Sequence, residues 1–522
     1  MKNCGIKFKL LILFVLQSIF LQAQLTPSQV DELVSKTIRA FDVPGISVGI
    51  LKDGKLVYAK GIGVRSLSNN LPMNEKTLVG IASNSKGFTC FSIALLVDEG
   101  KLKWDDKVIK YIPDFQLYDA YVSKEITIRD LCTHRSGLGL GGGDLMFFPE
   151  GGSFSTQDII HNLRYIKQHA SFRNTLEYNN NAFVVAGEII RRVSGLTWEE
   201  FVETRILKPV GMLSSVASYN RVKDHSNIID AHAPVDGKVV AVPHDWNPVA
   251  NPAGGIMSNI EDMAQWAQFL LDGGVTKNGK RLISEKQMNE LWNLQMPVPV
   301  PSKNSYDMRF NGYALGWFVN DVKGHKQVSH TGGLIGTVTQ FTLIPDLKLG
   351  IIVLTNQQSG AAFSAITNTI KDAYLGYDTR EWVDIYKKHT DAMSAEADSI
   401  VKSVYGKVDK EIKNPSCKVD ISGTYNDKWF GNIYIKKQGE VYNISCEKSP
   451  RLFGSLLPYD EKTWVAKWND RSYDADAFVK FIFDGSGNPQ GFTMEAISPN
   501  TDFSFDFQDL ELRKVKRSEE RR

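Results

Sequence analysis

Apolar residues recur along the first part of the chain with two different spacings, and these spacings predict the first elements. Residues 28–41 carry apolar side chains at helical spacing, namely Val30, Leu33, Ile38 and Phe41. Residues 45–66 then alternate around Asp53-Gly54, a dipeptide typical of a hairpin with a tight turn. A helix followed by a β-hairpin is therefore expected.

Helical spacing dominates residues 83–270, and strand patterns return after residue 313. The helical segments are "KGFTCFSIALLVDEG", "NAFVVAGEIIRRVSG" and "NIEDMAQWAQFLLDGG", and each ends at Gly. The late strand segments are "YALGWFV", "VTQFTLIP" and "KLGIIVLTN". Strands at both ends of a helical middle predict one antiparallel sheet flanked by helices, an α/β protein of the α+β type.

The last quarter of the chain has a different composition. Residues 379–415 are polar and charged and predict a helical connector. Residues 416–515 contain short alternating strands divided by Gly and Asn-Asp turns, which predicts a small all-β barrel or sandwich. A length of 522 residues with 42% hydrophobic content is enough for two cores, so we assign the main domain to 24–378.

Residues 1–23 have the composition of a secretory signal peptide. Lys2, Lys7 and Lys9 precede an apolar run from Leu10, no acidic residue is present, and cleavage is expected near Ala23. The run is shorter than the roughly 20 residues of a membrane span, although an uncleaved anchor remains the alternative. We therefore expect a periplasmic or secreted protein with no membrane span after signal removal.

Charge and cysteine content exclude several classes of partner. Loss of the three early lysines changes the formal charge from +2 to −1, which gives no electrostatic basis for binding nucleic acid or anionic lipid. No His pair has the HExxH spacing, so we expect no metal and no cofactor. Cys417 and Cys446 are either a disulfide pair or two buried thiols, and Cys90 and Cys132 show no metal spacing.

"IASNSKGFT" places Ser83 and Lys86 at the start of a strongly apolar helix. A capping Ser would be followed three residues later by Glu or Gln, because a carboxylate favours the positive end of the helix dipole. Lys86 has the opposite charge, and three residues along a helix bring its amine beside the hydroxyl. A partly desolvated lysine releases its proton more easily, so Ser83 is interpreted as a nucleophile with an adjacent base.

Three other serines match short nucleophile motifs and are set aside by context. Ser47 lies in "GISVG", but the alternation continues through it, whereas the G-x-S-x-G motif requires a sharp turn from strand to helix. Ser399 falls in the charged connector and Ser445 in a short strand of the late β unit.

Two further motifs supply the other groups that an acyl transfer needs. "LEYNNNAF" contains Tyr178 and Asn180 just ahead of a helix, and "SHTGGLIG" contains His330, Thr331 and Gly332 just before a strand. The first offers a second proton-handling group, and the second offers bare backbone that a substrate can approach.

These motifs resemble the serine hydrolase family of class C β-lactamases, DD-peptidases, D-aminopeptidases and related esterases. The resemblance extends from about residue 27 to 376 and includes four more segments, "ITIRDLCTHRSGL", "LKPVGM", "NPAGGIMSNIEDMAQW" and "YALGW". It implies a β-lactamase/transpeptidase-like sheet flanked by helices. The late β unit is similar to the lipocalin-like barrels appended to D-aminopeptidases, where it would stabilise the enzyme or form a wall without a ligand of its own.

The resemblance also implies the role of each residue. Ser83 would be acylated, Lys86 would be its proton partner and Tyr178 a second base. Asn180 would hold an amide of the substrate, and His330, Thr331 and Gly332 would bind substrate. The backbone N–H groups of Ser83 and Gly333 would form the oxyanion hole.

The sequence departs from that family at position 330, where efficient β-lactamases have Lys. A His that is mostly neutral at pH 7 is a poor anchor for a β-lactam carboxylate, which favours peptidase, amidase or esterase activity over β-lactamase activity. Among these, a peptidase or amidase acting on a small molecule or short peptide is the leading interpretation. A broad carboxylesterase, a weak β-lactamase and a non-catalytic muropeptide-binding protein are the alternatives. Residues 139–152, "GLGGGDLMFFPEGG", are expected to form a long flexible loop beside the cleft. The sequence leaves the natural substrate and the oligomeric state open.

Overall fold

A computed structural model describes residues 25–243, 247–378, 380–414, 416 and 419–516. The expected signal peptide at 1–23 and Cys417 lie outside these residues, so secretion and a Cys417–Cys446 disulfide stay predictions. No helix within the described ranges has the length and apolar character needed to cross a membrane.

An eight-stranded antiparallel sheet forms the centre of the main domain, with strand order β2-β1-β12-β11-β10-β9-β8-β7. The early hairpin thus pairs with the late strands, which confirms the sheet expected from the two ends of the domain. The strands are β1 (Gly45–Lys52), β2 (Lys55–Gly63), β7 (Met296–Pro297), β8 (Asn311–Tyr313), β9 (Phe318–Val322), β10 (His325–Leu334), β11 (Thr337–Ile344) and β12 (Leu349–Thr355).

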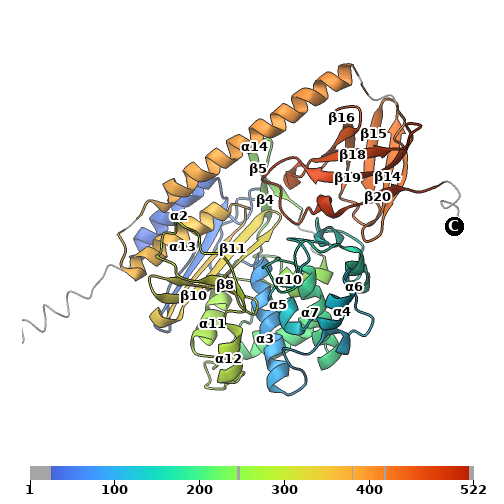
Figure 1. Ribbon diagram of the computed structural model, residues 1–522. Coiled ribbons are helices and arrows are strands. Elements are labelled where there is room, and N and C mark those ends of the chain that lie inside the picture. The colour runs from blue at the N-terminus through green and yellow to red at the C-terminus, as the bar shows by residue number, and fades with distance from the viewer. Residues whose placement is uncertain (1–24, 244–246, 379, 415, 417–418, 517–522) are drawn as a thin grey trace, which may run out of the picture.

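Helices cover both faces of this sheet (Figure 1). On β12, Ile351 and Val353 pack in the core under α2 (Pro27–Phe41) and α13 (Gly360–Leu375), while Ile352 and Leu354 pack in the core that includes α11 (Ile260–Leu271). Because strand side chains alternate between faces, a strand covered on both sides is buried throughout and mainly apolar, as β12 is.

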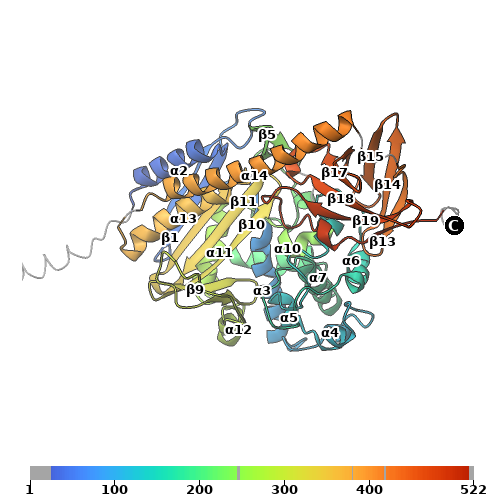
Figure 2. The ribbon, with the colours of Figure 1, turned by 45° about the horizontal axis from the view of Figure 1, so that its top comes forward.

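The helical region of the main domain lies on the α11 face of the sheet (Figures 1 and 2). Its remaining elements are α3 (Ser85–Asp98), α4 (Ala120–Glu125), α5 (Ile128–Cys132), α6 (Thr156–Asn162), α7 (Asn181–Ser194), α8 (Trp198–Val202), α9 (Lys208–Val210), α10 (Asn251–Gly254) and α12 (Glu285–Leu291). Two small strand pairs complete the domain, β3 (Val79–Gly80) with β6 (Met257–Ser258) and β4 (Ala231–Val235) with β5 (Lys238–Val242).

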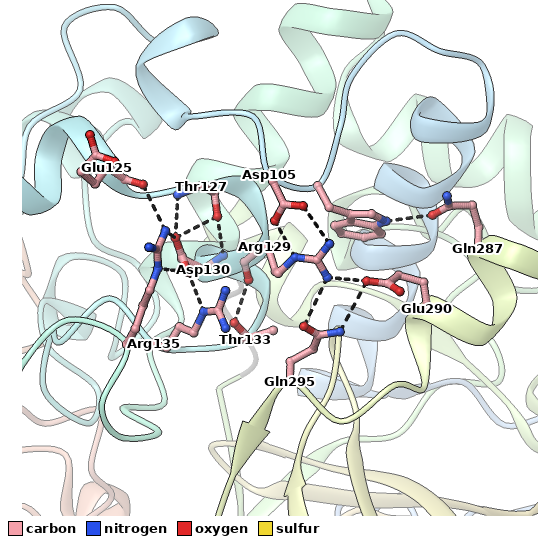
Figure 3. A network of polar contacts seen from close by, with 12 residues as sticks. Asp105, Glu125, Thr127, Arg129, Asp130, Thr133, Arg135, Gln287, Glu290 and Gln295 are labelled. Atoms are coloured by element: carbon pink, nitrogen blue, oxygen red, sulfur yellow. Dashed lines mark hydrogen bonds and ion pairs between the residues drawn. The ribbon is translucent and has the colours of Figure 1, made fainter.

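A buried ion-pair network fixes the segment that follows α5 (Figure 3). Asp130 accepts hydrogen bonds from Arg135 Nε at 2.5 Å and from Thr127 Oγ1 at 2.8 Å. Arg129 pairs with Glu290 on α12. Burial alone would raise the pKa of the Asp130 carboxyl, but its arginine partners bring that pKa below its usual value. The segment therefore has a fixed path toward the cleft.

The pattern "YALGWFV" was expected to be one continuous strand, and this expectation is wrong. A turn at residues 314–317 separates β8 from β9, and Gly316 in that turn has φ +78°. A Cβ at Gly316 would lie 2.8 Å from the Lys86 carbonyl oxygen, so the turn packs closely against α3. The apolar residues of this stretch are buried in a turn, which strand periodicity does not distinguish from a buried strand.

The last part of the chain is a long helix followed by a closed barrel. Helix α14 (Trp382–Lys413) runs from the side of α2 and α13 to the barrel (Figure 1). The barrel confirms the predicted all-β unit, with strands β13 (Gly423–Asp427), β14 (Gly431–Gln438), β15 (Val441–Cys446), β16 (Phe453–Pro458), β17 (Thr463–Trp468), β18 (Ala477–Phe483), β19 (Pro489–Ala496) and β20 (Leu512–Lys514).

Candidate active site

Ser83 lies in the short 3₁₀ turn η1 (Ala82–Asn84) that leads directly into α3. Ala82 before it has φ +50°, a conformation that costs free energy for a residue with a side chain. Strain of this kind persists where the surrounding structure holds it, and here β10 packs against η1. The Ser83 side chain is half-buried and lines the cleft.

Lys86, the second residue of α3, is fully buried, and its amine makes three hydrogen bonds. Lys86 Nζ donates to Ser83 Oγ at 2.9 Å, to Asn180 Oδ1 at 2.7 Å and to the Ala253 carbonyl at 3.0 Å. Burial lowers the pKa of Lys86 to about 7, although the nearby Asp144 carboxyl acts in the opposite direction. A neutral amine is therefore available near neutral pH to accept the Ser83 proton.

Tyr178 faces the same pair of residues from the segment before α7. The Lys86 amine lies 4.8 Å from the centre of the Tyr178 ring, and the phenol shares a hydrogen bond with Ser83. Burial raises the pKa of Tyr178 well above its usual value, so the phenol keeps its proton at neutral pH. The electrostatics favour Lys86 as the first base, and the expected basic role of Tyr178 stays a prediction.

Asn180 lies at the start of α7, and both ends of its side-chain amide are already hydrogen-bonded. Its Oδ1 accepts from Lys86, and its Nδ2 donates to Asp144 Oδ2 at 2.7 Å. Binding of a substrate amide by Asn180, which the family resemblance implies, would have to compete with these two contacts.

His330, Thr331, Gly332 and Gly333 lie within β10, which continues to Leu334. The motif was expected just before a strand, and β11 does begin soon after it, at Thr337; that the motif itself lies in a strand was not expected. His330 Nδ1 donates to the Thr331 carbonyl at 2.5 Å, and His330 Nε2 accepts from the Tyr313 hydroxyl at 3.0 Å. Burial and the Lys86 charge lower the pKa of His330 to about 3, so this imidazole is neutral.

The two glycines of this stretch have different surroundings. A Cβ at Gly332 would lie 2.3 Å from the Ile81 carbonyl oxygen, so only glycine permits the close approach of β10 to η1. Gly333 has open space around its missing side chain, and it is exposed to the cleft together with Thr331. Ser83 and Gly333 line the same cleft, as the proposed oxyanion hole requires.

Sequence reasoning did not single out His134, which packs against the Tyr178 ring. The centres of the His134 and Tyr178 rings are 4.2 Å apart, and His134 Nδ1 accepts from the Asn179 backbone N–H at 3.1 Å. His134 has φ +53° at the start of the segment that the Asp130 network fixes, next to Arg135. The segment was noticed for its family resemblance, but nothing in its pattern identified this ring.

Residues 139–152 form a packed segment, whereas a flexible loop was expected. Asp144 and the residues around it are buried, because the barrel covers this segment and bonds to it. Ser504 Oγ donates to Asp144 Oδ2 at 2.9 Å, and the carboxylate of Asp506 accepts from the backbone N–H groups of Gly143 and Leu145 at 2.6 and 2.9 Å. These partners lie about 360 positions apart in the chain.

A cleft of about 1070 Å³ opens above Ser83 between the main domain and the barrel. Main-domain residues line one side, and α14 contributes part of the edge. The barrel side includes Arg471, Tyr473, Asp474, Asp502, Phe503 and Phe505. The Phe503 ring contacts Tyr178 with 6.0 Å between ring centres. The barrel is therefore a wall of the cleft, consistent with one of the roles expected for it.

Comparison with known proteins agrees with this geometry. Residues 30–375 match the family described as Beta-lactamase. The chain belongs to the β-lactamase family. Residues 419–514 match a second family, described only as a domain of unknown function.

Two relatives within the β-lactamase family are unguisins hydrolase ungD' of Aspergillus campestris and protein flp of Staphylococcus aureus. The first is 28% identical over 373 residues, which cover 68% of this chain and 67% of that protein. The second is 27% identical over 333 residues, or 63% of each protein. The chain thus matches about two thirds of each relative's length.

A solved structure, the octameric penicillin-binding protein homologue from Pyrococcus abyssi, has the same fold as this β-lactamase family member. It aligns with a TM-score of 0.60 over 94% of this chain and all of that chain, at 22% identity. Together with the eight-stranded sheet and the closed barrel, this confirms the predicted fold class.

Proposed function

We propose that the protein is a serine hydrolase that cleaves an amide or ester bond of a small substrate through an acyl-Ser83 intermediate, with peptidase or amidase activity as its main reaction. The observation that carries this proposal is the contact of 2.9 Å between Lys86 Nζ and Ser83 Oγ, made by a buried amine whose pKa is about 7. A primary amine with that pKa is an effective base at neutral pH.

The reaction follows from the positions of these groups. Neutral Lys86 takes the Ser83 proton while Ser83 Oγ forms a bond to the substrate carbonyl carbon, and the carbonyl oxygen becomes an oxyanion facing the N–H groups of Ser83 and Gly333. Collapse expels the amine or alcohol, which receives the proton through Tyr178 or Lys86. Water then attacks the acyl carbon and gives a proton to the same base. The bond between the acyl carbon and Ser83 Oγ breaks, the acid leaves, and the base returns the proton to Ser83 Oγ.

The site favours a substrate that is not a β-lactam. His330 is neutral and hydrogen-bonded through both ring nitrogens, so it offers no positive charge to a substrate carboxylate. The barrel closes one side of the cleft, which supports a small substrate. The lysine-flanked apolar run in residues 1–23 supports action in the periplasm or outside the cell.

Carboxylesterase activity is the second candidate, and the state of Asn180 favours it. The Asn180 Nδ2 group already donates to Asp144, so a substrate with no amide in its acyl side chain loses nothing at this position. Esters also need less assistance to their leaving group than amides, which suits a tyrosine that holds its proton firmly.

A panel of three substrates tests the proposal and ranks its branches. We expect hydrolysis of D-amino-acid p-nitroanilides and of p-nitrophenyl acetate, and at most slow turnover of nitrocefin. Ser83→Ala should lower kcat by at least about a thousandfold. The matched control is Ser47→Ala, because Ser47 is buried in β1 and donates only to the Asn74 carbonyl at 3.2 Å. Turnover confined to nitrocefin would place β-lactamase activity ahead of peptidase, amidase and esterase activity. Full activity in Ser83→Ala would refute the mechanism.

A further inference from the structure

A chain of hydrogen bonds connects the C-terminal barrel to the buried amine beside Ser83. The Ser504 hydroxyl donates to Asp144 Oδ2 at 2.9 Å, the same oxygen accepts from Asn180 Nδ2 at 2.7 Å, and Asn180 Oδ1 accepts from Lys86 Nζ at 2.7 Å. All four side chains are buried. The path begins in the second domain and ends at the proposed base.

We propose that Asp144 and Ser504 are positioning residues of the active site, which hold Asn180 so that its carbonyl oxygen faces Lys86 and the Lys86 amine faces Ser83. This inference rests on the proposed function, in which Lys86 takes the Ser83 proton. In this proposal, the barrel positions side chains of the active site and also forms a wall of the cleft.

The argument depends on the two different ends of the Asn180 amide. An amide presents an acceptor at one end and a donor at the other, and a carboxylate accepts only. Asp144 therefore accepts from the NH₂ end of Asn180, and this leaves the oxygen end for Lys86. In the flipped orientation, an oxygen would face the Asp144 carboxylate, so that contact would be lost. An NH₂ group would face the Lys86 amine and occupy the lone pair that neutral Lys86 needs for the Ser83 proton.

Contacts from the barrel hold the segment that carries Asp144. Asp506 accepts the backbone N–H groups of Gly143 and Leu145 on either side of Asp144, so the backbone at this position is fixed from the barrel. A carboxylate buried this deeply costs free energy unless its hydrogen bonds are made, and two of the donors to Asp144 are Asn180 and Ser504. The barrel therefore supplies part of what allows a carboxylate to remain there.

The charges around the base set the sign of the expected effect. Burial lowers the pKa of Lys86, while Asp144 and Cys90 raise it. The other titratable groups near the amine are His134, His330 and Tyr178.

The charge state of Asp144 depends on its own neighbours. Burial raises the pKa of Asp144 to about 7, and Asp502 also raises this pKa. The hydrogen bonds from Asn180 and Ser504 and the charge of Lys86 lower it. Asp506 is the remaining nearby carboxyl.

We call the hydrogen-bond chain from Ser504 through Asp144 and Asn180 to Lys86 the relay. Two substitutions test it through the pH dependence of acylation, measured as the rate of covalent labelling by a fluorophosphonate probe. Asp144→Asn removes the anion, so the pKa of Lys86 should fall and the rise in rate should move about one pH unit lower. Ser504→Ala raises the pKa of Asp144 and should give a smaller shift in the same direction. Both variants should react about tenfold more slowly at the plateau, because Asn180 is less well held.

The conservative variant and a matched control separate positioning from stability. Ser504→Thr keeps the hydroxyl and should restore the wild-type pH profile. Ser498→Ala removes another buried barrel hydroxyl, which donates to Asp474 at 3.3 Å and has no contact with Asp144, and should keep that profile. Unchanged profiles in Asp144→Asn and Ser504→Ala, or an equal shift in Ser498→Ala, would overturn the relay.

A second measurement reads the relay without any reaction. In the full-length protein, NMR titration of ¹³C-labelled lysine, with Lys86 assigned by substitution, should show a lower midpoint for Lys86 in both variants than in the wild type. Equal midpoints would refute the relay even if labelling were normal. Conversely, a wild-type protein that the probe never labels would refute the proposed function, while the shift in midpoint would still report the contact.

Discussion

At the scale of single residues, the account depends on the burial of one amine. The Lys86 amine is buried against the rings of Tyr178 and Phe183, and it has three hydrogen-bond acceptors. Burial disfavours its charged form, and this turns a group that is normally protonated at pH 7 into a base. The sequence predicted the direction of this effect from the position of Lys86 beside Ser83.

The first prediction concerns pH. The reactive form of Lys86 is the neutral amine, and its pKa is about 7, so the rate of acylation should rise with pH through about 7 and level off above it. The measurement is the fluorophosphonate labelling rate from pH 5 to 9, with unfolding followed separately by circular dichroism. A rate independent of pH across this range would show that Lys86 is not the base.

A second prediction at this scale tests the need for a neutral form. Lys86→Arg keeps a cation beside Ser83 but removes the base, because guanidinium does not lose its proton in this range. Labelling should fall at least about a hundredfold at every pH, which is the usual contribution of a positioned base. A variant that retained most of its rate would point to another residue as the base, with Tyr178 the first candidate.

At the scale of elements, the sequence predicted the framework that carries the site but not all of its contacts. The helix after Ser83, the β1–β2 hairpin and the placement of Tyr178 before a helix follow from periodicity and turn chemistry, which are local. The turn at Gly316 was missed because buried turns and buried strands have the same apolar composition. His134 was missed because its contact with the Tyr178 ring is made only when the chain folds.

The close approach of β10 to η1 gives a prediction at this scale. Gly332→Ala would place a Cβ against the Ile81 carbonyl oxygen and so push β10 away from the turn that carries Ser83. We expect a loss of about 1–3 kcal/mol in the free energy of unfolding, measured by urea titration, together with slower labelling. Gly333→Ala is the matched control for stability, because its Cβ meets open space. Equal stability of the two variants would contradict the geometry.

At the scale of the whole molecule, the barrel and the main domain form the cleft together. The contacts of Ser504 and Asp506 with residues 143–145 join positions that no motif links, so the sequence could not predict them. It predicted a barrel and, as one possibility, a wall, but the hydrogen bonds that lead to Asn180 and Lys86 came only from the fold. The same contacts explain why a glycine-rich segment is packed where a flexible loop was expected.

A substitution at Phe503 tests whether the barrel limits the size of the substrate's acyl group. Its ring lies against Tyr178 in the cleft, and Phe503→Ala would remove that contact and enlarge the space above Ser83. We expect the ratio of kcat/KM for p-nitrophenyl butyrate to that for p-nitrophenyl acetate to rise by about tenfold, which corresponds to about 1.4 kcal/mol of relieved crowding. An unchanged ratio would show that the barrel does not limit the acyl group.

The central claim is that Ser83 becomes acylated, and one measurement tests it most directly. The full-length protein is incubated with a fluorophosphonate or a fluorescent penicillin, digested and mapped by mass spectrometry. The account predicts one adduct, on the peptide that carries Ser83, lost in Ser83→Ala and retained in Ser47→Ala. Failure of both probes to label the wild type at any pH, or an adduct on another serine, would contradict it and favour a protein that binds without catalysing.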